Sequence, residues 1–314
     1  MVVLKNEAEG FESFLKNYYQ SDSFSSRLEG KKLLFESINY SLFSGGKRFR
    51  PLLSLATAEI FDLPPEVVYP YAASIESIHT YSLIHDDLPC MDNDDLRRGK
   101  PTNHTVYKED IALLAGDALI SEAFAIIANH YWENSDKALQ LVSLLASSIG
   151  PQGMVAGQAL DLRSENSDLA LMNEIHLLKT GQLIKASTLG VGVISGASEE
   201  EMAALENFSL NLGMAFQLAD DLHDAEDGAN TSEASMVNIL GNDYLVIGNA
   251  DLAPLENVFW DDSERDIEIE QTATTIFYKL FDDNKEIQLA VDYDSEAEAC
   301  NFSSSQVKVV SPTL

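Results

Sequence analysis

One short stretch of the chain gathers acidic side chains and follows them at once with basic ones. Residues 86–95 contain five aspartates, and three cations come directly after them: Arg97, Arg98 and Lys100. Carboxylates this close together raise one another's pKa unless a cation lies between them. Mg²⁺ removes that repulsion, because it binds hard oxygen ligands and keeps positions for phosphate oxygens. The stretch therefore predicts a site for a metal-bound phosphate, and a solvated acidic turn that caps a helix is the alternative.

The acidic stretch follows a segment with helical spacing, so it should stand at the mouth of a buried helix. Apolar side chains recur there every few residues: Ile75, Ile78, Tyr81, Leu83 and Ile84. Asp86 and Asp92 are six residues apart, so on an unbroken helix they would point in different directions. Pro89 disfavours helical geometry at Leu88. We expect the helix to open there and the loop to fold Asp92 back toward Asp86.

A second acidic cluster lies in the segment FQLADDLHD, residues 216–224, which also follows apolar residues at helical spacing. At about 100° per residue, Asp220 and Asp224 lie about 40° apart on one helix face, and Asp221 flanks them. Two acidic clusters, each on an apolar helix, can face each other across a cavity.

These two segments resemble the aspartate-rich motifs of trans-isoprenyl diphosphate synthases. Three further segments match that family in order and spacing: GGKRFRP at residues 45–51, GQALDL at 157–162 and KTG at 179–181. The resemblance extends over about residues 30–241 and is greatest to bacterial farnesyl diphosphate synthases, with geranylgeranyl diphosphate synthases next. It implies an all-α, isoprenoid-synthase-type bundle around a deep central cavity in residues 1–241.

The resemblance also implies which residues hold the metal and the substrates. Magnesium, as three ions, would be carried by five aspartates with Asp221 in support: Asp86, Asp87, Asp92, Asp220 and Asp224. The allylic diphosphate would be held by Arg97, Lys179 and Gln217, while Thr180 faces the developing cation. Isopentenyl diphosphate would be held by Lys47, Arg50, His79 and Arg98. Gln158 and Asp161 share one helix face near this site, and His85 has no assigned role.

The implied reaction explains why such residues are needed. An allylic diphosphate loses pyrophosphate, whose charge magnesium and Lys or Arg donors neutralise, and the double bond of isopentenyl diphosphate attacks the cation. Water would quench that cation, so the pocket must be apolar and closed. No Ser, Cys or His nucleophile is required, and Cys90 is incidental. A terpene cyclase would not need the basic segment at residues 45–51, and a weakly active or inactive partner subunit is the alternative of another class.

Tyr81 and Ser82 bear on the length of the product. Tyr81 lies five residues before Asp86, more than one helical turn deeper, where the growing hydrocarbon tail should run. By resemblance, an aromatic ring there forms a floor that stops the product at about fifteen carbons, because close packing leaves little room. Ser82 is too small to block the tail, and an ordinary core role for Tyr81 is the alternative.

The end of the chain departs from the family pattern. Glu233 occupies the place of an expected lysine, and no Lys or Arg occurs between Lys185 and Arg265. Residues 242–314 hold 16 acids against 4 bases, and they alternate apolar and polar side chains as strands do. This acidic segment, of unknown role, is predicted to be β-rich. Three interpretations remain open for this segment: an added β-rich appendage, a partner-binding segment, or a non-native end of the reading frame.

Composition limits the partners of the chain. Its formal net charge of −31 argues against nucleic acid and anionic membrane surfaces as ligands. Its two cysteines do not make a disulfide framework, which suits the cytoplasm. The first ten residues lack an apolar signal core, and we expect no run to reach transmembrane length. The resemblance also implies a homodimer, with small-molecule diphosphates as the substrates.

Overall fold

The computed structural model describes residues 2–164 and 169–226, together with five strands between residues 267 and 310. The chain divides into two compact units, residues 9–241 and residues 1–8 with 242–314. Each unit is described by itself. The division into a synthase domain (1–241) and an acidic segment (242–314) stays a prediction.

The first unit is built from helices, which confirms the predicted all-α class. Short segments join them: the 3₁₀ turn η1 (Asp22–Phe24), the π-helical turn η2 (Leu177–Gly181), and the hairpin β1 (Leu96–Arg97) with β2 (Lys100–Pro101). The described helices are α1 (Val2–Tyr19), α2 (Glu29–Leu42), α3 (Phe49–Ile60), α4 (Pro65–Asp86), α5 (Asn103–Tyr107), α6 (Glu109–His130), α7 (Ser135–Ile149), α8 (Met154–Asp161), α9 (Leu169–His176), α10 (Gln182–Ser195) and α11 (Glu199–Glu226).

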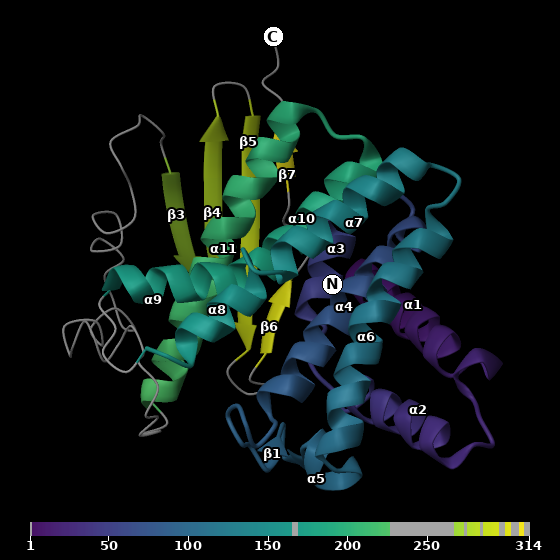
Figure 1. Cartoon of the computed structure of the whole chain (residues 1–314). Helices are drawn as coiled ribbons and strands as arrows, with labels where there is room; N and C mark the ends of the chain where they lie inside the picture. The colour runs from purple at the N-terminus through teal and green to yellow at the C-terminus, as the bar shows by residue number, and fades with distance from the viewer. Residues whose placement is uncertain are drawn as a thin grey trace. The chain divides into compact units, whose positions relative to one another are not determined.

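Helix α4 is the centre of this unit, and it lies among α3, α6 and α10 (Figure 1). Its side chains are buried on every face, because apolar and small residues run all round it. Ala72, Ala73 and Ser77 allow neighbouring helices to approach closely, while Tyr71 and Ile75 fill the space between them. A fully buried helix is a rigid platform for the acidic loop at its end.

Two polar contacts fix α10 against α3 and α4. The Tyr71 hydroxyl donates to the carbonyl oxygen of Ala186 at 2.8 Å, and the Ser54 hydroxyl donates to that of Ser187 at 2.8 Å. Gly190 makes room for the Tyr71 ring, since a Cβ atom there would lie 2.0 Å from it. These contacts set the position of the segment just before α10, which carries Lys179.

Two described segments are long and apolar enough to cross a membrane by length and composition: Glu109–His130 and Ser135–Asp161. The sequence prediction did not single them out. In the structure, α6 buries Ala115, Leu119 and Ile126 in the core, as a core helix does. Its outer side still exposes Leu113 and Leu114, which are 46% and 50% exposed.

The second unit contains an antiparallel sheet, as the alternating pattern predicts. Its strand order is β3-β4-β5-β6, and β7 also pairs with β5. Residue pairs such as Ile276 with Val291 and Val291 with Phe302 set the register. The strands are β3 (Ile267–Thr272), β4 (Thr275–Asp282), β5 (Lys285–Asp294), β6 (Ala299–Phe302) and β7 (Lys308–Val310).

Candidate active site

The first aspartate motif turns back on the end of α4. The helix ends at Asp86, and the amide of Asp92 donates to the carbonyl oxygen of Asp86 at 2.9 Å. Asn93 adopts a left-handed backbone conformation, with φ of 57°, which an asparagine tolerates well. The predicted opening of the helix and return of the loop are therefore confirmed, and Asp86 and Asp92 come from the two sides of one turn.

Arg97 holds this loop to the helix. Its Nε atom donates to Oδ1 of the buried Asp87 at 2.6 Å, and its Nη2 atom lies 3.4 Å from Asp94. Burial raises the pKa of Asp87, and the nearby guanidinium of Arg97 opposes that rise. Arg97 therefore stands beside the metal-ligating candidates, with part of its surface still exposed to solvent.

The carboxylates of Asp86 and Asp92 lie in an environment that calls for a cation. Burial raises the pKa of Asp86 to about 7; Lys179 opposes this rise, and Asp92 adds to it. Burial also raises the pKa of Asp92, again against the charge of Lys179. A carboxyl group with a raised pKa gains from a bound divalent cation, which favours the charged form.

Lys179 lies on the π-helical turn η2, opposite the first aspartate motif. Its Nζ atom donates to Oδ2 of Asp161 on α8 at 2.6 Å. Burial lowers the pKa of this lysine, but the carboxylates of Asp161, Asp86 and Asp92 outweigh burial and raise it. The structure thus brings together three segments that are distant in sequence: the end of α4, the end of α8 and the turn before α10.

A second group of side chains carries excess positive charge. The pKa of Arg50 is lowered to about 10, chiefly by burial and also by the charge of Arg98, while Glu76 opposes the shift. His79 has its pKa lowered by burial, and then by Arg50 and Arg98. The Nε atom of Arg50 is buried and has no hydrogen-bond partner. Each of these cations disfavours the charged form of its neighbours, and one N–H donor is left without a partner. Such a group is suited to binding an anion such as a diphosphate.

The GGKRFRP segment forms the base of this cationic group. Arg98 donates to the carbonyl oxygen of Gly45, and Lys100 donates to that of Ser44 at 3.0 Å. Gly46 has a φ of 129°, which favours glycine, and a Cβ atom there would lie 2.3 Å from the Arg98 guanidinium. The hairpin of β1 and β2 therefore joins the aspartate loop to this segment, while Lys47 remains exposed.

The remaining basic residue of the segment, Arg48, has a structural role that the sequence prediction left unassigned. It donates to Glu12 on α1 and to Glu76 on α4, each at 2.5 Å, and to the carbonyl oxygen of Leu42 at 2.7 Å. No signal within the segment identifies this role, because its partners Glu12 and Glu76 lie 36 and 28 residues away in the sequence.

The second aspartate motif lies on α11, and its side chains fall outside the described residues. These are Gln217, Asp220, Asp221 and Asp224; Glu233 also lies outside the described part. Among the described side chains, no group of three or more His, Cys, Asp or Glu residues is close enough to hold a metal ion. The first motif therefore needs further ligands, and the cavity between the two motifs stays a prediction.

Tyr81 and Ser82 lie on α4 as the sequence requires. Tyr81 is 6% exposed, and its ring packs edge-on to that of His85, with centroids 5.7 Å apart. The Ser82 hydroxyl donates to the carbonyl oxygen of His79 at 2.9 Å. His85 also contacts the carbonyl oxygen of Leu113 at 3.0 Å, which gives it a packing role, and Cys90 is exposed.

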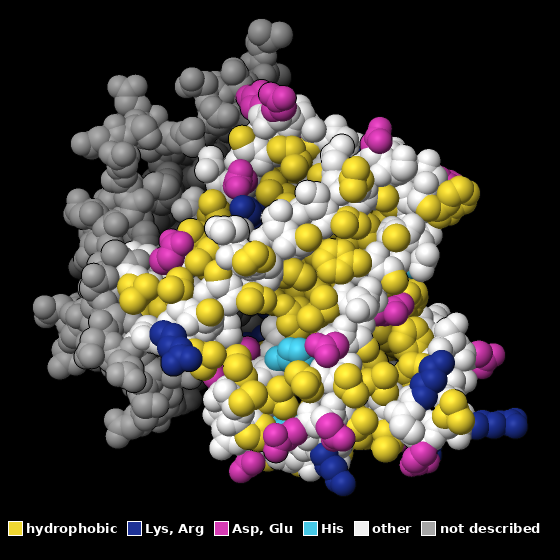
Figure 2. Space-filling model, viewed as in Figure 1, with side chains coloured by type: hydrophobic (Ala, Val, Ile, Leu, Met, Phe, Trp, Pro, Cys, Tyr) yellow, Lys and Arg dark blue, Asp and Glu magenta, His cyan; other side chains and the backbone are white. Residues whose placement is uncertain are grey.

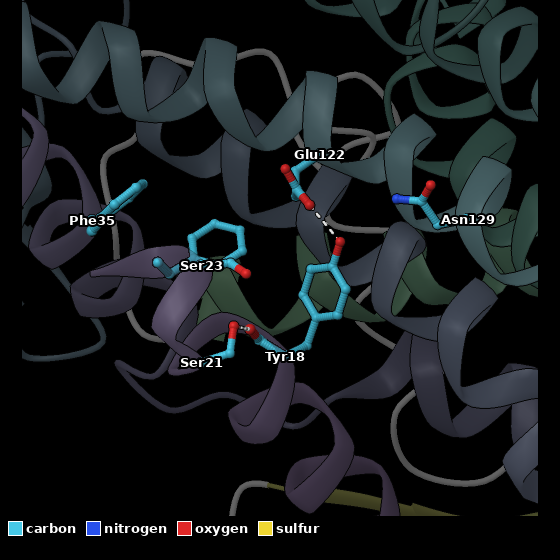
Figure 3. Close-up of a pocket in the computed structure, with 7 residues that line it drawn as sticks. Tyr18, Ser21, Ser23, Phe35, Glu122 and Asn129 are labelled. Atoms are coloured by element: carbon cyan, nitrogen blue, oxygen red, sulfur yellow. Dashed lines mark hydrogen bonds between the residues drawn. The ribbon is translucent and has the colours of Figure 1, made fainter. Parts of the chain in front are cut away.

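A pocket of about 530 Å³ lies away from these residues, between η1, α2 and α6 (Figure 3). Tyr18 donates to Glu122 across it, and Asn129 lies further along α6. None of the residues that line it belongs to the motifs described above, so this pocket is not the candidate active site.

The described residues fit a magnesium-bound diphosphate. The side-chain amide nitrogen and oxygen of Gln158 are both buried without a hydrogen-bond partner, and so is the Nε atom of Arg50. Such groups cost about 1–3 kcal/mol each unless a ligand or water satisfies them. Oxygen-rich Asp86 and Asp92 supply the donor type that Mg²⁺ prefers.

Comparison with known proteins identifies the family of the chain. The chain matches the polyprenyl synthetase family over residues 31–243. It is 45% identical over 227 residues to farnesyl diphosphate synthase from Geobacillus stearothermophilus, covering 71% of this chain and 74% of that enzyme. It is 46% identical over 196 residues to the chloroplastic geranylgeranyl pyrophosphate synthase 7 from Arabidopsis thaliana, covering 61% of this chain and 56% of that enzyme.

Solved structures of similar fold are also prenyl synthases. An FPP/GFPP synthase from Zymomonas mobilis superposes with a TM-score of 0.71 and 36% identity, covering 78% of this chain and 88% of that one. A geranyltransferase from Helicobacter pylori gives a TM-score of 0.68 and 39% identity, covering 78% and 85%. The chain therefore belongs to the polyprenyl synthetase family and is a trans-prenyltransferase enzyme.

Proposed function

We propose that this enzyme condenses dimethylallyl or geranyl diphosphate with isopentenyl diphosphate and releases pyrophosphate, giving farnesyl diphosphate. The observation that carries the proposal is the pairing of two differently charged sites near the end of α4. Asp86, Asp92 and Lys179 form one site, and Arg50, Arg98 and His79 form the other. A reaction that joins two diphosphates needs two such sites.

The acidic site would hold the allylic diphosphate. The family is Mg²⁺-dependent. Three such ions, held by Asp86, Asp87, Asp92, Asp220 and Asp224 with Asp221 in support, would neutralise the departing pyrophosphate. Arg97 and Lys179 would bind its outer oxygens, and Gln217 would orient it. These cations are preorganised by Asp87 and Asp161, so they need little rearrangement as charge develops.

The basic site would hold isopentenyl diphosphate. Arg50, Arg98 and His79 surround one position near α4, and the exposed Lys47 would close over it from the solvent side. His79 would bind as the neutral imidazole and donate one hydrogen bond, because burial and the two arginines lower its pKa. Thr180, on the turn beside Lys179, would face the developing carbocation.

The product length would be set by Tyr81. Its ring is buried on α4, five residues before Asp86, where a growing tail would run. Geranylgeranyl diphosphate is the alternative product, because relatives that make it match this chain as well as farnesyl diphosphate synthases do.

A homodimer in the cytoplasm is part of the proposal. Hydrophobic side chains gather on the face that carries α6 and α7 (Figure 2), among them the exposed Leu113, Leu114 and Leu139. A second copy of the chain would cover this face, since a helix apolar all round is usually buried all round.

Turnover of the purified protein tests the proposal. The full chain is given Mg²⁺, isopentenyl diphosphate and either dimethylallyl or geranyl diphosphate, and the products are separated by chain length. We expect fifteen-carbon diphosphate and one pyrophosphate per condensation. No turnover with either allylic substrate would instead favour the inactive partner subunit, for which the Glu233 departure is the motive.

A further inference from the structure

The backbone of Lys179 lies directly against Gly157 of α8. A Cβ atom at Gly157 would lie 2.3 Å from the amide nitrogen of Lys179 and 2.7 Å from its Cα atom. Ordinary contacts of a Cβ atom begin at 3.4 Å, so a larger residue requires a shift of about 1.1 Å. The atoms it would meet belong to backbone, so the turn itself would have to move.

A second glycine, on α11, also lies directly against the backbone of this turn. A Cβ atom at Gly213 of α11 would lie 2.9 Å from the Cα atom of Gly181. Between these two glycines the backbone makes the π-helical turn, in which the amide of Gln182 donates to the carbonyl oxygen of Leu177, five residues back. Such wide turns are rare and often lie at functional sites.

The same helix that contacts the backbone of Lys179 also receives its ammonium group. Asp161 lies four residues after Gly157 and hence on the same side of α8. Its carboxylate accepts from the Lys179 Nζ atom at 2.6 Å. A lysine side chain carries about 2 kcal/mol of rotamer entropy, so holding both ends fixes a group that is otherwise mobile.

We propose that Gly157 is a positioning residue for the reaction. With Gly213 it clamps the π-helical turn, and with Asp161 it places the Lys179 ammonium opposite Asp86 and Asp92. The inference rests on the proposed role of Lys179 in binding the allylic diphosphate. It predicts that filling the Gly157 contact harms the allylic site and leaves the isopentenyl diphosphate site intact, since Arg50, Arg98 and His79 lie on other elements.

Kinetics of the Gly157→Ala variant test this separation. We expect kcat/KM for geranyl diphosphate to fall about 100-fold, as a misplacement of about 1 Å commonly causes, with KM for isopentenyl diphosphate within twofold of the wild type. Gly30→Ala is the matched control, because nothing lies within 4 Å of a Cβ atom there. Equal rises in both KM values, or an unchanged kcat/KM for geranyl diphosphate, would overturn the proposal.

Hydrogen exchange gives a readout that needs no turnover. We expect faster exchange in the peptide that covers residues 177–182 of Gly157→Ala, and unchanged exchange in α3. Unchanged exchange in the turn would overturn the clamp. If the wild-type protein turns over no substrate, the proposed function fails, while the exchange result still decides whether Gly157 clamps the turn.

A second variant guards against a failure to fold. Asp161→Asn keeps the shape of the side chain and removes its charge. The backbone contact between Gly157 and Lys179 therefore stays, while the ion pair with the Lys179 ammonium group is lost. We expect a rise of about tenfold in KM for geranyl diphosphate, consistent with the loss of one charge-assisted hydrogen bond, and normal exchange in residues 177–182. An unchanged KM would show that Asp161 does not place Lys179, and would overturn that part of the proposal.

Discussion

At the scale of single residues, the proposed metal site centres on Asp86, a partly buried carboxylate whose pKa burial raises. We expect Asp86→Ala to lower kcat by about 10²–10³ at saturating Mg²⁺, because it removes an electrostatic contribution to the leaving of pyrophosphate. Steady-state kinetics measures the loss, and unfolding in denaturant shows that the fold is kept. Turnover close to that of the wild type would contradict the proposed metal site.

The carboxyl group of Asp86 makes the stability of the metal-free protein depend on pH. Burial raises the pKa of Asp86 to about 7, above its ordinary value of 3.8. Between these pH values the folded protein binds more protons than the unfolded chain, so stability falls as pH rises from about 4 to about 7. In the presence of a chelator, Asp86→Asn should therefore be more stable than the wild type at pH 8 and equal to it at pH 3. Asp95→Asn, at an exposed position of the same loop, should show no such difference.

Tyr81 gives a prediction about product length. Its ring is buried within the core cluster of α4, so removing it opens space below the acidic loop. We expect Tyr81→Ala to make twenty-carbon or longer diphosphates while retaining turnover. Chromatography of the dephosphorylated products measures this. An active variant with unchanged products, or a wild type that already makes twenty carbons, would refute the floor and favour a geranylgeranyl diphosphate synthase.

At the scale of elements, Arg48 shows what the sequence could not predict. Helix geometry and Pro89 were enough to predict the return of Asp92, because both act within one turn. The basic segment contains three cations of similar type, and only tertiary packing shows that Arg48 pairs with Glu12, 36 residues away. The clamp at Gly157 was hidden for the same reason, since a motif does not reveal which backbone it touches.

The network around Arg48 should be important for stability. Its side chain is 10% exposed and that of Glu76 only 4%, so Arg48→Met leaves a buried carboxylate without its main partner. We expect a loss of about 3 kcal/mol in the free energy of unfolding, as for other broken buried pairs. Arg48→Met combined with Glu76→Gln should lose less than the single variant, and an equal or larger loss would contradict the pairing. Denaturant titrations measure all three proteins.

At the scale of the whole molecule, the sequence predicted the helical class and the strands near the end of the chain. Both follow from hydrophobic periodicity, which is a local property. The relation of the two aspartate motifs is not local, and the side chains of Asp220 and Asp224 lie outside the described residues. The exposed leucines of α6 likewise became visible only once the core positions of that helix were known.

Those leucines lead to the prediction of a dimer. Helix α6 presents Leu113 and Leu114 next to the buried Ala112 and Ala115, so one side of an apolar helix is left uncovered in a single chain. Covering it with a second copy removes that apolar surface from water at about 25 cal/mol per Å². We expect sedimentation to show a dimer at micromolar concentration. Leu113→Glu combined with Leu114→Glu should give a folded monomer, because each introduced carboxylate would be buried without a partner at the interface.

A control with the same kind of charge change separates this effect from general repulsion. Ile60→Glu alters an exposed apolar side chain at the end of α3, a helix that packs mainly on α4 and α10, and should leave the dimer intact. Because the chain already carries a net charge of −31, long-range repulsion alone would affect both variants. A dimer that survives the α6 substitutions would place the interface elsewhere, and a wild type that sediments as a monomer would refute the homodimer. Loss of the dimer in the α6 variant alone would assign the interface to α6.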